Sequence, residues 1–320
     1  MHPQSVLSRS PYFDLHVMAE GVYAAVAREG AGAMSNAGIV DLGGITLVFD
    51  TFLTYPAAAD LRRAAEELTG RPVQAVVNSH WHGDHVQGNQ VFPGAMIFAT
   101  ERTRELVRDM IAAPNAGLNR PGLEQHVQQL TEAIERATDD RVRAGLRSDR
   151  DDFSRFLAVY DSTSVVLPNV SVTDRLVVRG SRRQAELLCV GAGHTESDLL
   201  LYLPDDGIAF VGDLVAVGNH PWLGHGDPDA LVAVHERILA LGVHTVIPGH
   251  GLPGTTAAVA RATAYVRELQ ALSAELAATN APDEAAGAVA IPALASDWGT
   301  AHMFAENLRF LQSLHLSQME

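Results

Sequence analysis

The stretch NSHWHGDHVQGN, residues 78–89, constrains the fold of this chain more than any other part of its sequence. It places His80, His82, Asp84 and His85 within six residues, directly after the apolar run VQAVV. The chain has 14 histidines in 320 residues, so three histidines at these positions of one window are expected by chance only about 0.03 times. Crowded imidazole and carboxylate groups are costly to bury unless they bind something. The stretch therefore predicts a metal site at the end of a strand.

Three further candidate ligands follow apolar runs in the second half of the chain. His194 follows LLCVGAG, Asp213 ends IAFVGD and His250 ends TVIPGH. Each follows a glycine at the end of a predicted strand, where a loop can expose a side chain at the edge of a sheet. One such residue alone is usually an ordinary loop residue. Together with the histidine motif, the three indicate one site built from both halves of the chain.

The first half of the chain reads mostly as strands and tight turns. Residues 21–29 and 38–51 are rich in residues that favour strands, with a hairpin signal at Gly43-Gly44. A helix is predicted from Pro56 to Gly70, where apolar residues recur at helical spacing. From about 101 to 163 the sequence is charged and helical in period, which predicts a helical insertion.

Strand-like sequence resumes after the insertion, with helices between the later strands and a last amphipathic helix at about 300–316. Two strand-rich halves with helices outside them predict an α/β fold, a four-layer αββα sandwich in which two sheets pack face to face. We expect one domain over residues 1–320, with the helical insertion as part of it.

Composition narrows the classes of function. The net charge is −15 and all the basic residues are arginine, so nucleic-acid binding is disfavoured. No run of about 18 apolar residues is present, which argues against a membrane helix. The first 14 residues show no signal peptide. A cytoplasmic protein is expected, with a secreted mature form left open.

The motif HWHGDH, with His194 in GHTESD, Asp213 in VGD and His250 in PGHG, resembles the ligand set of the metallo-β-lactamase superfamily. The resemblance extends over roughly residues 21–251. It implies the αββα fold with a metal site at the shared edge of the two sheets, in agreement with the layers expected from the strand pattern.

The resemblance also implies a role for each ligand. His80, His82 and His194 would bind one metal ion, Asp84, His85 and His250 a second, and Asp213 would bridge both. This nitrogen and oxygen set suits two Zn²⁺ ions, with iron or manganese as possible substitutes. Asp50, in VFDT, matches the family's first motif and is expected behind the ligands, where it would fix their loop by hydrogen bonds.

The function implied is that of a metal-dependent hydrolase. A hydroxide held by the dinuclear site would cleave an acyl C–N, C–O or C–S bond of a small molecule such as a β-lactam, lactone, ester or thioester. Asp84 would also act as the catalytic proton shuttle. The alternatives are a phosphodiesterase or nuclease, against which the charge speaks, and an iron-dependent oxidoreductase of the same fold. The diiron relatives usually carry Glu where this chain has His82, which argues against the diiron type.

The chain departs from the best-known antibiotic-hydrolysing branch, which has a Cys ligand at the position of Asp213 and a substrate-binding Lys that is absent here. β-Lactamase activity therefore stays open, as does assembly into a homo-oligomer. The substrate pocket is expected between the insertion and two loops, and its predicted wall residues are Met34, Asn36, His220, Trp222 and His225.

Overall fold

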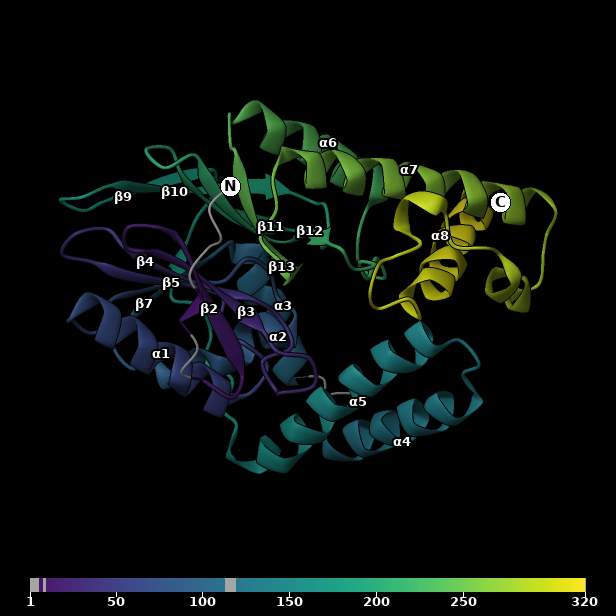
Figure 1. Cartoon of the computed structure of the whole chain (residues 1–320), viewed down its shortest axis with the longest axis horizontal. Coiled ribbons are helices and arrows are strands. Elements are labelled where there is room, and N and C mark those ends of the chain that lie inside the picture. Colours follow the sequence, from purple (N-terminus) through teal and green to yellow (C-terminus); the bar gives the residue numbers. More distant parts are fainter. Residues whose placement is uncertain (1–5, 8–9, 113–118, 320) are drawn as a thin grey trace.

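The computed structural model describes residues 6–7, 10–112 and 119–319. Two β-sheets face each other, and helices cover their outer faces (Figure 1). The predicted four-layer αββα sandwich and its helical insertion are confirmed. Within the described residues, no helix combines the length and apolarity needed to cross a membrane.

The first sheet has eight strands in the described part of the chain, and they follow one another in sequence order. Pairing is antiparallel from β1 to β5 and parallel from β5 to β8. The β4–β5 hairpin turns at Gly43 and Gly44, whose φ angles of +80° and +95° favour glycine. The strands are β1 (Val6–Leu7), β2 (Phe13–Ala19), β3 (Val22–Ala27), β4 (Ala37–Asp41), β5 (Thr46–Phe49), β6 (Ala75–Val77), β7 (Met96–Ala99) and β8 (Val170–Ser171).

The second sheet has the strand order β13-β12-β11-β10-β9 among the described residues. Its pairs are antiparallel except β12 and β13, which run parallel because helix α6 crosses between them. The strands are β9 (Arg175–Arg179), β10 (Gln184–Gly191), β11 (Asp198–Leu203), β12 (Ile208–Val217) and β13 (Thr245–Gly251).

Helix α1 begins and ends where the sequence predicts. Pro56 lies in its first turn, and the N–H of Gly70, at φ +69°, closes its end by donating to the carbonyl of Glu66. The helices are α1 (Tyr55–Thr69), α2 (Gly83–Val86), α3 (Glu101–Ala112), α4 (Arg120–Arg136), α5 (Asp140–Val159), α6 (Pro228–Ala240), α7 (Thr256–Ala278) and α8 (Met303–Met319). The short turns are η1 (Gln87–Val91), η2 (Tyr160–Ser162), η3 (Asp283–Ala288) and η4 (Ala293–Ala295).

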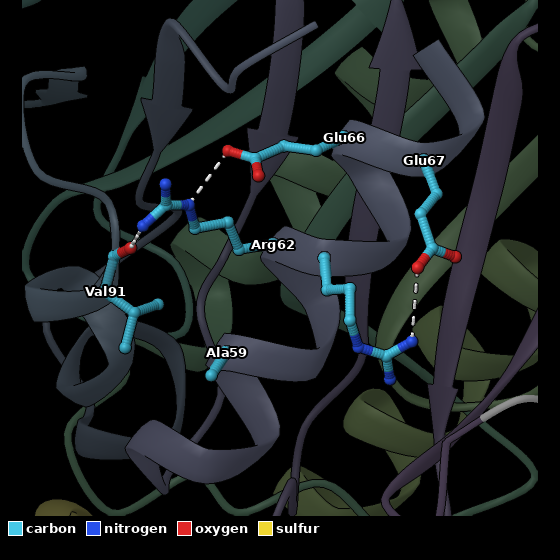
Figure 2. Close-up of a pocket in the computed structure, with 6 residues that line it drawn as sticks. Ala59, Arg62, Glu66, Glu67 and Val91 are labelled. Atoms are coloured by element: carbon cyan, nitrogen blue, oxygen red, sulfur yellow. Dashed lines mark hydrogen bonds and ion pairs between the residues drawn. The ribbon is translucent and has the colours of Figure 1, made fainter. Parts of the chain in front are cut away.

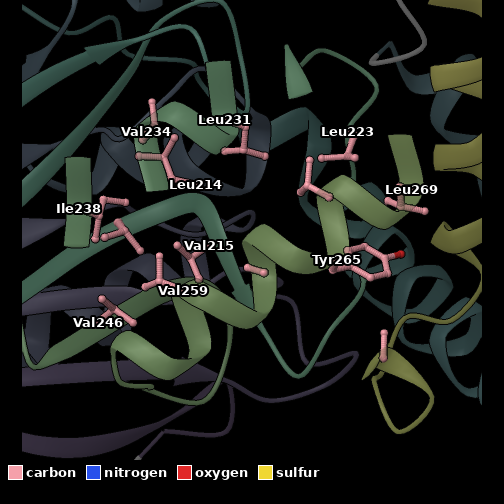
Figure 3. Packing of buried hydrophobic residues seen from close by; sticks show 14 of the residues in the cluster. Leu214, Val215, Leu223, Leu231, Val234, Ile238, Val246, Val259, Tyr265 and Leu269 are labelled. Carbon is pink, nitrogen blue, oxygen red and sulfur yellow. The ribbon is translucent and has the colours of Figure 1, made fainter. Parts of the chain in front are cut away.

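Three apolar layers hold the sandwich together. Between the sheets, the rings of Phe49 and Phe210 lie 5.7 Å apart within a buried cluster drawn from both sheets. Helix α1 buries Leu61 against the outer face of the first sheet. Helices α6 and α7 cover the second sheet, with Val234 and Val259 among the buried side chains (Figure 3). This packing fixes the two sheets relative to each other, and so it fixes the strand ends that carry the candidate ligands.

The helical insertion is fastened to the loop between β3 and β4. Helices α4 and α5 run alongside each other and project below the first sheet (Figure 1). From α5, Asp152 accepts a hydrogen bond from the N–H of Gly32 at 2.6 Å, and Nε of Arg155 donates to the carbonyl of Gly30 at 2.7 Å. The insertion therefore helps to hold a loop that reaches the candidate site.

Candidate metal centre

The structure brings the seven predicted metal-binding side chains together at one edge of the two sheets. Four of these side chains come from the first half of the chain, in the segment that follows β6 and continues into α2. The second sheet supplies one after β10, one within β12 and one within β13. The side chains form two groups, in each of which the ligand atoms lie within 4.8 Å of one another. The groups are His80, His82, His194 and Asp213, and Asp84, His85 and His250.

In the group of three histidines, the ring nitrogens converge. Nδ1 of His82 lies 2.9 Å from Nε2 of His80 and 3.0 Å from Nε2 of His194. One Nδ1 carries either a proton or a lone pair, so it can make one hydrogen bond but here faces two nitrogens. Nitrogens bound tetrahedrally at 2.0–2.1 Å from zinc would be about 3.3 Å apart. The observed spacing is close to that arrangement.

The second group shares Asp213 with the first. Oδ2 of Asp84 lies 3.2 Å from Nε2 of His85 and 3.4 Å from Nε2 of His250. The carboxylate of Asp213 lies 3.2 Å from Nε2 of His85, 3.4 Å from that of His250 and 3.3 Å from that of His194. Asp213 therefore contacts both groups, in the position expected of a bridging ligand.

Two buried atoms at the centre of the site support a bound cation. Nε2 of His85 and Oδ1 of Asp213 are buried and lie 3.2 Å apart, but neither makes a hydrogen bond in the described part of the chain. Buried polar atoms are rarely left unpaired, so such atoms call for an explanation. Five imidazoles and two carboxylates also make a donor set that suits zinc. The residues present fit divalent metal ions.

The histidines of the first group are neutral. Burial lowers the pKa of His80 and of His82 well below the ordinary value, and neighbouring imidazoles lower it further. Burial likewise lowers the pKa of His194 to about 4. A neutral imidazole has a free lone pair, which is the form that binds a metal ion.

The second group is charged. Burial opposes ionisation of Asp84 and Asp213, but nearby histidines outweigh it and hold the pKa of each carboxyl well below its usual range. Burial would lower the pKa of His250, but the carboxylates, Asp213 foremost, raise it to about 10. Burial would also lower the pKa of His85, but the nearby carboxylates, Asp84 foremost, raise it well above its usual value. Without metal, protons on these two imidazoles balance the carboxylates.

Asp50 lies directly behind the ligands. Its carboxylate accepts hydrogen bonds from the backbone N–H and the hydroxyl of Ser79, each at 2.8 Å, and lies 2.8 Å from Nδ1 of His85. The Ser79 hydroxyl is in turn 2.9 Å from Nδ1 of His80. Asp50 thus holds one ligand of the second group directly and one of the first group through Ser79.

Gly249 makes room for the shared carboxylate. A Cβ atom at this position would lie 1.8 Å from Oδ1 of Asp213, far inside contact distance. Asp213 follows Gly212, which has φ +53° and lies at an irregularity in the pairing of β12 and β13. The backbone of these two strands therefore shapes the space into which Asp213 points.

The predicted pocket residues lie in different places. Trp222 and His225 are next to the site, with ring centroids 5.3 and 5.2 Å from that of His82. Met34 has φ +68° and packs against a cluster that includes Phe156 of α5.

Asn36 and His220, also predicted as wall residues, are buried and make hydrogen bonds within the protein. Asn36 is buried, and its amide accepts from the N–H of Ala27 and donates to the carbonyls of Pro248 and Gly251. His220 is buried with Nδ1 2.6 Å from the hydroxyl of Tyr265. Both residues therefore bind the protein through at least one polar atom.

Sequence reasoning missed two contributors to the site. The ring of Trp81, inside the motif, lies 4.7 Å from that of His82. Asp198 holds the His194 loop by accepting hydrogen bonds from the N–H and hydroxyl of Thr195. The spacing of Thr195 and Asp198 resembles a turn-capping pattern and could have indicated this contact. No comparable signal distinguished Trp81 from a packing residue.

A separate hollow of about 500 Å³ lies on the outer surface of α1 (Figure 2). Its charged side chains pair with one another, as in the contacts of Arg62 with Glu66 at 2.9 Å and of Arg63 with Glu67 at 3.5 Å. None of the seven candidate ligands lines it. Its chemistry offers no reactive group, so the metal centre remains the candidate site.

Solved structures support the fold. The chain is similar to a metallo-beta-lactamase from Erythrobacter litoralis with beta-mercaptoethanol in its active site (18% identity, 82% of this chain, 100% of that chain, TM-score 0.58). It is also similar to FIM-1 from Pseudomonas aeruginosa in the mono-zinc form (15% identity, 79% and 94% coverage, TM-score 0.55). A double mutant of the sec-alkyl sulfatase PisA1 matches 94% of this chain and 50% of that chain (17% identity, TM-score 0.66).

The family follows from a match that spans both halves of the site. Residues 30–250 match the model of the metallo-beta-lactamase superfamily. This range is more than half of the chain and includes all seven side chains of the metal centre. This chain therefore belongs to the metallo-beta-lactamase superfamily.

Proposed function

We propose that the chain is a dinuclear zinc hydrolase that cleaves an acyl C–N, C–O or C–S bond of a small molecule. The observation that carries the proposal is the position of Asp213, whose carboxylate lies within 3.4 Å of ligand nitrogens from both groups. A carboxylate so placed can serve two cations at once. The family, whose members are generally hydrolytic enzymes, agrees with this assignment.

The chain's own residues hold and orient the centre. The neutral imidazoles of His80, His82 and His194 would bind one cation, and Asp84, His85 and His250 the other. Two divalent cations would polarise a substrate carbonyl and supply an ionised water molecule near neutral pH. Asp50 fixes the ring of His85 so that Nε2 faces Asp84 and Asp213.

Asp84 is the proposed catalytic proton carrier. Its carboxyl group is ionised, lies at the centre of the second group, and keeps 14% of its side chain exposed. It can therefore accept a proton from the attacking water and pass it to the departing amine, alkoxide or thiolate. Its backbone is held in place by Ser35, whose hydroxyl donates to the carbonyl of Asp84.

The surroundings of His82 favour a substrate with an apolar portion. Trp81 and Trp222 both lie against its ring, with centroids 4.7 and 5.3 Å away. Indole faces provide large apolar contact areas. The net charge of −15 disfavours a polyanionic substrate such as nucleic acid.

A substrate panel tests this function. The purified protein is assayed for metal content and for hydrolysis of chromogenic lactam, lactone, ester, thioester, phosphodiester and sec-alkyl sulfate compounds. The sulfate is included because the sulfatase structure matches 94% of this chain. We expect turnover of at least one acyl compound and none of the phosphodiester.

The variant Asp84→Asn should lower that turnover by at least about 100-fold. Asp109→Asn, on the exposed face of α3, is the matched control and should keep the wild-type rate. Turnover confined to the phosphodiester or the sulfate would contradict the acyl assignment. An Asp84→Asn enzyme with the wild-type rate would remove Asp84 from catalysis.

A further inference from the structure

The histidines of the first group differ in the partners of their second ring nitrogens. Nδ1 of His80 lies next to Ser79, and Nδ1 of His194 is buried without a partner among the described residues. Nε2 of His82 lies 3.0 Å from Nδ1 of His225, a residue 143 positions later in the chain. The contact of His82 thus joins the motif of the first sheet to a loop of the second.

The ring of His225 packs against two tryptophans. Its ring centroid lies 4.9 Å from that of Trp81 and 4.6 Å from that of Trp222, with the second pair nearly perpendicular. The side chain is exposed, but these contacts limit its rotation.

The loop that carries His225 is also tied to the loop of His194. The N–H of Asp227 donates to the carbonyl of Gly193 at 3.0 Å. A Cβ atom on Gly226 would lie 2.8 Å from that same carbonyl, so the two loops pack backbone to backbone. The position of His225 is therefore fixed relative to the first group.

The direction of the hydrogen bond follows from the geometry at His82. Its Nδ1 faces the nitrogens of His80 and His194, so a metal-binding His82 must present a lone pair there. A neutral imidazole with a lone pair on Nδ1 carries its proton on Nε2. That proton faces Nδ1 of His225, which can accept it if it keeps its own proton on Nε2.

We propose that His225 is a positioning residue for His82: by accepting this hydrogen bond it selects the tautomer and ring orientation that direct Nδ1 of His82 to the first group. The inference rests on the proposed function, because it assigns a role around the same metal centre. Residues that hold metal-binding histidines in this way typically contribute 10- to 100-fold to metal affinity. His225 is exposed, so we expect about 10-fold.

Two variants separate hydrogen bonding from packing. His225→Asn keeps an acceptor oxygen near the position of Nδ1 but loses the ring. His225→Phe keeps a ring in contact with the two tryptophans but loses the acceptor. His244→Asn, at an exposed histidine that belongs to neither group, is the control.

The first readout is zinc affinity, measured by competition with a chelator and resolved into two binding steps. We expect His225→Phe to weaken one step by about 10-fold, with His225→Asn and the control close to wild type. A wild-type affinity in His225→Phe together with a loss in His225→Asn would overturn the proposal in favour of packing. Equal affinities in all the proteins would overturn it as well.

The second readout is the ¹H–¹⁵N spectrum of histidine ring N–H groups in the zinc-bound protein, which reports whether the Nε2–H proton of His82 is hydrogen-bonded. We expect this proton to be protected from exchange with water in the wild type and in His225→Asn, and to exchange rapidly in His225→Phe. Rapid exchange in the wild type would overturn the inference. This readout is independent of catalysis, so a protein that shows the protected proton but hydrolyses no compound of the panel would refute only the proposed function.

Discussion

The two ligand groups lie side by side but differ in what stands behind them. Apart from the shared Asp213, the first consists of neutral imidazoles, two of which contact the side chains of Ser79 and His225. The second contains the ionised Asp84 and is backed by the buried carboxylate of Asp50, which contacts His85. The first group therefore offers lone pairs directly. The second balances charge, and a cation would replace protons there.

The largest effect is expected where the two groups meet. Asp213→Asn removes the charge that contacts both groups, so we expect it to weaken metal binding in both. We expect loss of bound zinc from both groups and a fall in kcat of up to about 1,000-fold, the upper end of the range for a lost electrostatic group. Metal analysis and steady-state kinetics measure the two effects. Full metal content with an unchanged kcat would show that Asp213 serves neither group.

A smaller effect on zinc affinity is expected at Asp50 and Ser79, which contact ligands of different groups. The amide of Asp50→Asn has one acceptor oxygen, so it cannot both accept the hydrogen bonds from Ser79 and hold His85. We expect this variant to lower zinc affinity by about 10- to 100-fold, chiefly in the second group. Ser79→Ala should affect only the first group, through His80. Chelator competition on both variants makes the comparison. Identical losses in the two variants would mean that Asp50 does not support His85 separately.

A separate effect, on the stability of the fold rather than on metal binding, is expected at Asp152 of α5, and it depends on pH. Burial raises the pKa of Asp152 from 3.8 to about 7, although N–H groups, that of Gly32 first, lower it. The folded chain thus keeps a proton on Asp152 over a pH range in which the unfolded chain has lost it. This stabilisation is complete below about pH 4 and is lost as pH rises to about 7.

Asp152→Asn removes this titration while keeping an acceptor for Gly32. The free energy of unfolding of the wild type, relative to the variant, should fall between about pH 4 and pH 7 by no more than about 4 kcal/mol. It should stay level above that range. Denaturant unfolding at several pH values measures it, and a difference that rises with pH would contradict the assignment.

The parts of the site that the sequence predicts are those encoded locally. Four ligands lie within six residues after one strand, so their convergence needs no knowledge of distant packing. Of the later ligands expected at strand ends, His194 follows β10, but Asp213 lies within β12, which continues to Val217, and His250 lies within β13. The layers followed from the strand and helix periods. The resemblance then supplied their grouping around two metal ions.

The parts that could not be predicted depend on contacts between distant segments. Asn36 and His220 were expected in the pocket because a polar loop residue looks the same in sequence whether it binds backbone or faces solvent. The contact between His82 and His225 depends on how the loop after β12 packs against the first sheet. The space for Asp213 depends on Gly249 in the neighbouring strand.

The most direct test of the account is removal and return of metal. Purified protein is stripped with a chelator, and zinc is added back in steps while bound metal and the hydrolysis of an acyl substrate are measured together. The account predicts that the stripped protein is folded but inactive, and that activity returns as the chain binds two zinc ions. Stripped protein that keeps its full rate would contradict it.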